Sequence, residues 1–166
     1  HAAPGGFCMR SLHIGHSIVL VDKWDPEECL KLIDQHKVSV THMVPTMFYR
    51  CLNLSEEIKN KYDISSIKSV IHGAAPVAIE KKKAMIDWWG PVLIEYYGAT
   101  EGGGTVCQSE DWLKRPGTVG INWPGSDVKI LDDEGNELPA KTEGTIFMSS
   151  LSGKFEYYKD KAKTEK

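Results

Sequence analysis

The sequence lacks any long hydrophobic run, and its longest wholly apolar stretch is Ile18 to Val21. A transmembrane helix needs about 20 mostly apolar residues, so no segment of this sequence qualifies as one. Neither sign of charge dominates, because 20 Lys and Arg stand against 23 Asp and Glu, for a net charge of −3. A dedicated nucleic-acid-binding protein usually carries a clear basic excess, so this balance argues against nucleic acid as a partner.

Paired cysteines are also missing. The four cysteines are far apart and form no CxxC pair; they are Cys8, Cys29, Cys51 and Cys107. Such spacing predicts neither a zinc site nor a dense disulfide framework. We therefore expect a reduced, cytoplasmic setting. The chain does not begin with Met and stops within a Lys-rich segment, so we expect it to be part of a longer protein.

The 166 residues are enough for about one domain, and 41% hydrophobic with 26% charged residues is an ordinary globular mixture. Short apolar runs alternate with helical patterns through the first two-thirds of the chain. The expected strands are Ser17–Val21, Val38–Val44, Ile67–Ile71 and Val92–Tyr96. The expected helices are one that begins at Pro26 with Asp25 as its N-cap, one over Thr46–Leu52, and one that Pro76 opens and Gly90 ends. Repeated strand–helix–strand units predict an α/β fold with a parallel sheet flanked by helices.

The sequence pattern changes after about Cys107, where Gly, Pro and short β runs replace the helical patterns. Val128–Leu131 and Thr145–Met148 are predicted to be strands, with turn chemistry between them at residues 133–136. We expect a small antiparallel β subdomain here. The predicted division is an α/β subdomain over residues 1–107 and a β-rich subdomain over residues 108–166 that is truncated at its end.

The run Lys81-Lys82-Lys83 lies within the helix that follows Pro76. Met85, Ile86 and Trp89 fall on the inner side of that helix. The simplest interpretation of the lysine run is the solvated outer face.

The segment Glu95 to Gly104 carries the most chemical information. It follows a predicted buried strand, and ligands of open α/β sheets bind beyond the carboxyl ends of strands. Thr100 offers a hydroxyl for a phosphate oxygen, Glu101 offers a hard oxygen ligand suited to Mg²⁺, and Tyr97 offers an aromatic face. No Gly-Lys-Ser/Thr follows, so the segment is not a Walker A loop. Taken without other knowledge, a plain Gly-rich turn is the alternative.

A second segment, His72 to Pro76, also follows a predicted strand and precedes a helix. Its small residues leave the backbone beside the sheet edge open to a ligand. The helix that follows begins here, and a helix N-terminus favours anionic groups. Alone it could be an ordinary strand-to-helix turn. The two segments follow consecutive strands, so we expect them to flank one crevice.

Together the two segments resemble the adenylate-forming superfamily, which includes acyl-CoA synthetases, luciferases and peptide-synthetase adenylation domains. Residues 97–101, Tyr-Gly-Ala-Thr-Glu, match the family's YGxTE motif, and residues 73–76 match its GAAP adenine loop. The opening His1 to Phe7 is similar to the end of the motif whose His lies near the carboxylate substrate. The sequence of residues 95–101 is most similar to the corresponding motif of fatty-acyl-CoA synthetases.

This resemblance implies an acid–thiol ligase that uses ATP, Mg²⁺, coenzyme A and a carboxylic acid, and the sequence of that motif favours a fatty acid. It implies catalytic roles for Thr100 at the α-phosphate and Glu101 as the Mg²⁺ ligand. The residues that it implies for acid binding are His1, Gly102 and Gly103. The residues that it implies for binding the adenine nucleotide are Gly73, Ala74, Ala75, Pro76, Tyr97 and Gly98, with Tyr97 stacked on the base.

The family's phosphate loop should precede His1, its ribose-binding Asp should follow a segment like Tyr157–Asp160, and its mobile C-terminal domain should supply a catalytic Lys. The chain contains none of these, so we expect N- and C-terminal parts of the parent protein to be missing and the fragment alone to be inactive. A non-catalytic module that binds a nucleotide or a protein partner is the rival hypothesis. Another aryl or acyl acid is the nearer alternative. The first Asp is Asp22, well past the His1 motif, and this disfavours amino acids as substrates.

Overall fold

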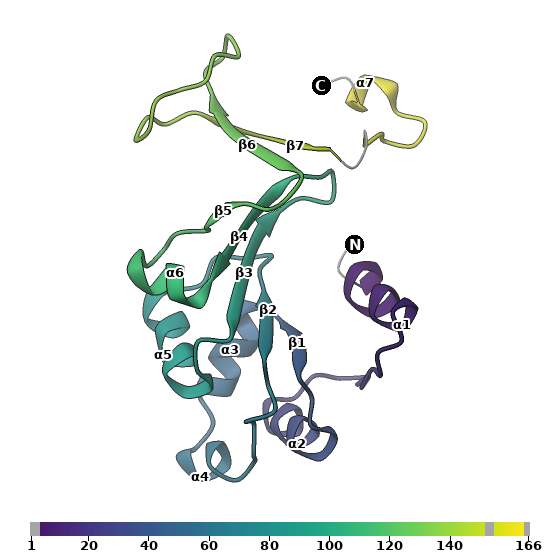
Figure 1. Cartoon of the computed structure of the whole chain (residues 1–166), viewed down its shortest axis with the longest axis vertical. Coiled ribbons are helices and arrows are strands. Elements are labelled where there is room, and N and C mark those ends of the chain that lie inside the picture. Colours follow the sequence, from purple (N-terminus) through teal and green to yellow (C-terminus); the bar gives the residue numbers. More distant parts are fainter. Residues whose placement is uncertain (1–3, 152–154, 165–166) are drawn as a thin grey trace.

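The structure is a computed structural model that describes residues 4–151 and 155–164. Its elements follow the chain from the N-terminal segment, through an α/β body, to a two-stranded ribbon (Figure 1). The helices are η1 (Pro4–Met9, a π-helix), α1 (Arg10–His13), α2 (Pro26–His36), α3 (Pro45–Leu52), α4 (Glu56–Lys59), α5 (Ile79–Trp89), α6 (Ser109–Lys114) and α7 (Lys161–Thr164). The strands are β1 (Val40–Met43), β2 (Ser69–His72), β3 (Leu93–Gly98), β4 (Gly104–Gln108), β5 (Ile121–Asn122), β6 (Ser126–Leu131) and β7 (Thr145–Ser150).

The main sheet has the order β1-β2-β3-β4-β5. Strands β1, β2 and β3 are parallel and are joined by the helices expected between them, whereas β4 and β5 add antiparallel pairs at the far edge. The predicted parallel sheet flanked by helices is therefore confirmed, as part of a mixed sheet. β4 was not expected, because its five residues begin within the glycine run.

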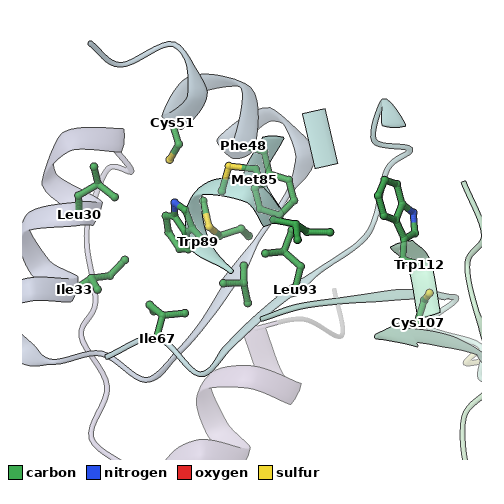
Figure 2. Close-up of a cluster of buried hydrophobic side chains, with 13 residues drawn as sticks. Leu30, Ile33, Phe48, Cys51, Ile67, Met85, Trp89, Leu93, Cys107 and Trp112 are labelled. Atoms are coloured by element: carbon green, nitrogen blue, oxygen red, sulfur yellow. The ribbon is translucent and has the colours of Figure 1, made fainter. Parts of the chain in front are cut away.

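One face of this sheet carries the hydrophobic core. Figure 2 shows side chains from α2, α3 and α5 converging around Met85 and Trp89, with Trp112 and Cys107 to one side. The strands contribute alternate residues to this face, including Val70 on β2 and Leu93 on β3, both fully buried. The helical pattern of the sequence thus places its apolar stripes against the sheet.

The opposite face of the sheet presents His42, Ile71 and Ile94, which are in register across β1, β2 and β3. These residues are half-buried. The N-terminal helix η1 lies over this face, where the Phe7 ring stacks on His42 with centroids 4.3 Å apart.

The second sheet pairs β6 with β7 in antiparallel register, from Ser126 opposite Ser150 to Leu131 opposite Thr145. This confirms the predicted antiparallel unit. The expected turn forms at Asp132, whose Oδ1 accepts hydrogen bonds from the amides of Glu134 and Asn136. The main sheet continues through β5, and the second sheet begins at Ser126. The proposed subdomain boundary at residue 107 remains a prediction.

Two predicted elements differ in the structure. Residues Ser17–Val21 are not a strand, since none of the described residues offers them a pairing partner, and Leu20 is 77% exposed. The helix expected from Pro76 begins three residues later, at Ile79. Ala78 is the N-cap, with an extended backbone, and its amide donates a hydrogen bond to the Tyr49 hydroxyl over 3.3 Å.

The interpretation of the lysine run is wrong for its central residue. Lys82 is completely buried, while Lys83 is exposed and pairs with Asp87. The reason lies in helical spacing, because Lys82 precedes Met85 and Trp89 by three and seven residues and therefore shares their inward face.

No helix in the described ranges is long and apolar enough to cross a membrane.

Candidate nucleotide site

The two sequence motifs meet at neighbouring strand ends. β2 and β3 run parallel with His72 opposite Glu95, so the loop from Gly73 starts beside the end of β3. The approach is very close: a Cβ on Gly73 would lie 2.5 Å from the Tyr96 carbonyl oxygen. Only glycine fits at this point, and the sheet thereby brings residues 73–76 beside the Tyr97 motif.

The 73–76 loop is mostly exposed, and its backbone is strained. Gly73 is buried, but Ala74, Ala75 and Pro76 are all exposed. Ala74 has a φ of 67°, a left-handed conformation that costs a non-glycine residue free energy and is concentrated at functional sites. A flat ligand can therefore approach this backbone without displacing packed side chains.

The second loop turns through Thr100–Gly104 and is braced from the second sheet. Gly103 has a φ of 74°, and a Cβ there would lie 2.6 Å from the Cβ of Met148 on β7. The turn therefore needs glycine both for its backbone conformation and for its contact with β7. Thr100 and Glu101 are left exposed at its tip.

The carboxylate of Glu101 is held by a residue far along the chain. The Tyr157 hydroxyl donates a hydrogen bond to Oε1 of Glu101 over 2.7 Å. This bond is the main reason that the pKa of Glu101 lies below its ordinary value, and the charge of Lys163 acts in the same direction. The Lys163 ammonium lies 4.0 Å from the centre of the Tyr157 ring. Glu101 is therefore a preorganised anion, and no side chain in the described part of the chain donates a hydrogen bond to its second oxygen.

Glu101 borders a cavity of about 920 Å³. β7 supplies Met148 and Ser149 to its wall, and the C-terminal segment supplies Tyr157 and Asp160. A site for Mg²⁺ usually takes one or two carboxylates together with substrate phosphates. The described residues hold no cluster of three or more side chains of the metal-ligating types His, Cys, Asp and Glu. The donor set at Glu101 therefore fits a cation that a phosphate chain helps to bind.

On the face of the main sheet opposite the hydrophobic core, aromatic rings lie next to the Gly73 loop. The Tyr96 ring packs over Gly73, and its hydroxyl lies 3.2 Å from Nε2 of His42. Phe7 stacks on His42, and burial lowers the pKa of that imidazole. Phe7, His42 and Tyr96 thus form an aromatic wall, in which burial favours the neutral form of the imidazole.

Sequence reasoning missed a buried ion pair behind the two loops. Lys82 Nζ lies 2.5 Å from Oε2 of Glu95, and both side chains are at least nine-tenths buried. The neighbouring His72 is completely buried, and neither of its ring nitrogens has a hydrogen-bond partner among the described residues. Burial, followed by the charge of Lys82, lowers the pKa of His72 to about 3, so this imidazole is neutral.

Signals for only some of these residues were present in the sequence. Helical spacing could have placed Lys82 inside, whereas nothing local to Tyr157 indicates that it reaches Glu101. Of the residues predicted for the site, Tyr97 is 42% exposed at the end of β3, and Gly102 is half-buried within the turn. Gly98 is exposed at the end of β3. His1 lies outside the described residues, so its predicted role stays a prediction.

Comparison with known proteins agrees with this geometry. The family model for AMP-binding enzymes matches residues 1–158. The chain belongs to this family. The predicted resemblance to adenylate-forming enzymes is therefore confirmed, whereas the role of residues 73–76 and 97–101 in binding a nucleotide remains a prediction.

Relatives within the family act on different acids, as their names state. The chain is 36% identical over 134 residues to the long-chain-fatty-acid–CoA ligase of Bacillus subtilis (strain 168), covering 80% of this chain and 24% of that protein. It is 29% identical over 164 residues to 4-coumarate–CoA ligase-like 2 of Arabidopsis thaliana, covering 96% and 29%.

A solved structure gives the same result for the fold. The amide bond synthetase McbA from Marinactinospora thermotolerans superposes with a TM-score of 0.85 at 25% identity, covering 93% of this chain and 32% of that one. The chain thus spans about a quarter to a third of the length of these proteins.

Proposed function

We propose that the intact protein is an acid–thiol ligase that activates a carboxylic acid with ATP and transfers the acyl group to coenzyme A. The observation that carries this proposal is the meeting of the Gly73 and Tyr97 loops at the ends of two parallel strands, with Gly73 tight against Tyr96. Family membership over residues 1–158 supports the same reaction class.

In the first step, a carboxylate oxygen of the acid attacks the α-phosphorus of ATP. The bond to pyrophosphate breaks, and an acyl-adenylate remains. In the second step, the sulfur of coenzyme A attacks the acyl carbon, AMP leaves, and the thiol proton passes to solvent. The enzyme must mainly align two anions and stabilise the charge that develops on phosphate.

The exposed Ala74 and Ala75, next to the buried Gly73, support a role of this loop in lining the adenine, with Pro76 at its end. Tyr97 and Gly98 stand at the end of β3, where an exposed phenol ring can stack on the base. This arrangement supports binding of a nucleotide across the two loops.

Thr100 and Glu101 are exposed at the tip of the glycine turn, where Glu101 borders the cavity, and we assign both to the phosphates. Thr100 offers a hydroxyl to the α-phosphate. Glu101 would hold Mg²⁺, which when bound screens the negative charge of the phosphate oxygens. Its lowered pKa keeps the carboxylate charged and ready to bind a cation.

The acid is proposed to be a fatty acid, because the relative at 36% identity carries that name. The aromatic wall of Phe7, His42 and Tyr96 favours a second candidate, a flat aryl acid, because aromatic rings pack well against one another. Gly102 and Gly103 are proposed to adjoin the acid, and His1 would border its carboxylate.

The four cysteines form no disulfide in the described part of the chain, which supports a reducing, cytoplasmic setting.

The test is acid-dependent release of pyrophosphate by the intact protein, followed by consumption of the coenzyme A thiol. Long-chain, medium-chain and aryl acids are compared under one condition. Turnover with a fatty acid supports the first candidate, and turnover with aryl acids alone supports the second. Nucleotide binding without pyrophosphate release from any acid would instead support the non-catalytic module. We expect residues 1–166 alone to give no sustained release.

A further inference from the structure

The buried pair of Lys82 and Glu95 is unusual because it lies beneath the site and not at the surface. The Lys82 side chain has no exposed surface, and that of Glu95 is 10% exposed. Removing two charges from water is costly, and an apolar pair of the same volume is often as stable or more stable. Burial lowers the pKa of Lys82, while the hydrogen bond that Lys82 donates to Glu95 opposes that change. Stability alone therefore gives little reason for a charged pair at this place.

The pair links the two elements that carry the nucleotide loops. Lys82 lies in the first turn of α5, the helix that directly follows the 73–78 loop. Glu95 lies on β3, two residues before Tyr97. A short, charge-assisted hydrogen bond tolerates little change in distance or direction. A shift of α5 relative to β3 would break this bond, and it would also change the spacing between the two loops.

The Lys82 ammonium also interacts with residues on other elements. It lies 4.8 Å from the centre of the Trp112 ring on α6, a cation–π contact within the core. Its charge also reaches His72, the last residue of β2 and the one before Gly73. Lys82 thus interacts with β2, β3 and α6 from a single position on α5.

We infer that Lys82 and Glu95 are positioning residues, whose buried ion pair sets the spacing between the Gly73–Ala78 loop and the Tyr97–Gly104 loop. The inference rests on the proposed function, because the two loops matter together only if they bind one nucleotide. The competing explanation is that the pair contributes to folding and nothing else.

Three variants of the intact protein separate these explanations. Lys82→Met leaves Glu95 unpaired, and Lys82→Met with Glu95→Met replaces the ion pair by an apolar pair of similar volume. Lys83→Met is the matched control, because Lys83 is adjacent on the same helix but makes an exposed ion pair with Asp87. The measurements are melting temperature, KM for ATP with kcat, and hydrogen exchange in peptides covering residues 73–78 and 97–104.

The double variant is expected to melt at or above the wild-type temperature, because the cost of burying charges is removed. Its KM for ATP is nevertheless expected to rise about tenfold, since small misplacements of binding groups reduce reactivity strongly. Amides of both loops should exchange about tenfold faster, and Lys83→Met should match the wild type in all measurements. A double variant with wild-type KM and wild-type loop exchange would overturn the inference.

Two further outcomes are decided in the same experiment. If the apolar pair does not fold, Lys82→Arg retains the charge but displaces its donor, and a wild-type KM in that variant overturns the inference. If the wild-type protein shows no acid-dependent pyrophosphate release, the proposed function fails. The exchange rates of the two loops then decide the positioning role by themselves.

Discussion

The hydroxyl of Tyr157 donates a hydrogen bond to the Glu101 carboxylate across 56 residues of sequence, with an oxygen–oxygen distance of 2.7 Å. This bond joins the C-terminal segment to the glycine turn after β3. It also favours the charged form of Glu101, because it is the largest of the interactions that lower the pKa of that carboxyl. The residue proposed to hold Mg²⁺ therefore depends on a side chain outside its own motif.

Tyr157→Phe removes this hydrogen bond and little else. The pKa of Glu101 should rise toward its ordinary value, so the carboxylate is lost at a higher pH as the medium is acidified. The concentration of Mg²⁺ for half-maximal pyrophosphate release should increase by up to about tenfold, because the hydrogen bond that favours the charged carboxylate is lost. Mg²⁺ titrations of the intact protein at several pH values measure both effects. Tyr158→Phe is the control, since Tyr158 is 87% exposed; equal Mg²⁺ requirements in the two variants would contradict the prediction.

Glu101→Ala should lower acid-dependent pyrophosphate release about 10²–10³-fold, the usual effect of losing one preorganised electrostatic group. The free energy of unfolding should change by less than about 1 kcal/mol, because the side chain is exposed. Glu143→Ala, at another exposed position, should leave the rate unchanged. A Glu101→Ala protein with the wild-type rate and Mg²⁺ dependence would remove Glu101 from the site.

Gly73→Ala should damage the site by steric overlap alone. The new Cβ would lie 2.5 Å from the Tyr96 carbonyl oxygen and 2.9 Å from the Tyr96 ring, so β2 and β3 must shift apart. We expect a loss of roughly 1–3 kcal/mol in the free energy of unfolding, as for other overpacked sites. KM for ATP should increase as well. Gly6→Ala is the control, because a Cβ on Gly6 meets nothing within 4 Å; similar denaturation midpoints for the two variants would show that the contact is not tight.

His72 should make stability depend on pH. Its pKa falls from 6.5 to about 3 in the folded protein, so below pH 6.5 the unfolded chain binds a proton that the folded protein does not. Stability should therefore be independent of this group above pH 6.5 and decrease as the pH falls from 6.5 toward 3. The slope is about 1.4 kcal/mol per pH unit, which amounts to about 2 kcal/mol between pH 6.5 and 5.

Urea denaturation at several pH values measures this slope. His72→Phe should flatten it, whereas His36→Gln, which alters an exposed imidazole, should retain the wild-type slope. An unchanged slope in His72→Phe would mean that another group titrates in this range.

Local rules in the sequence were enough to predict much of the fold. The amides of Glu27 and Glu28 donate to Oδ1 of Asp25, as the predicted cap of α2 requires. The strands before the two loops formed close to their predicted positions, because apolar runs followed by glycine have few alternatives. The adjacency of residues 73–76 and 97–101 followed from the rule that parallel strands end at one edge of a sheet.

Tertiary structure decided what depends on distant partners. Residues Ser17–Val21 have the composition of a strand, but a strand forms only where another backbone can pair with it. Helical spacing places Lys82 on the inward face of α5, but the partner that meets its charge is Glu95, 13 residues away. Glu101 is likewise oriented by Tyr157. Capping, turns and alternation act over a few residues and can be found in the sequence. Burial of a charge or orientation of a carboxylate depends on which segments the packed core brings together.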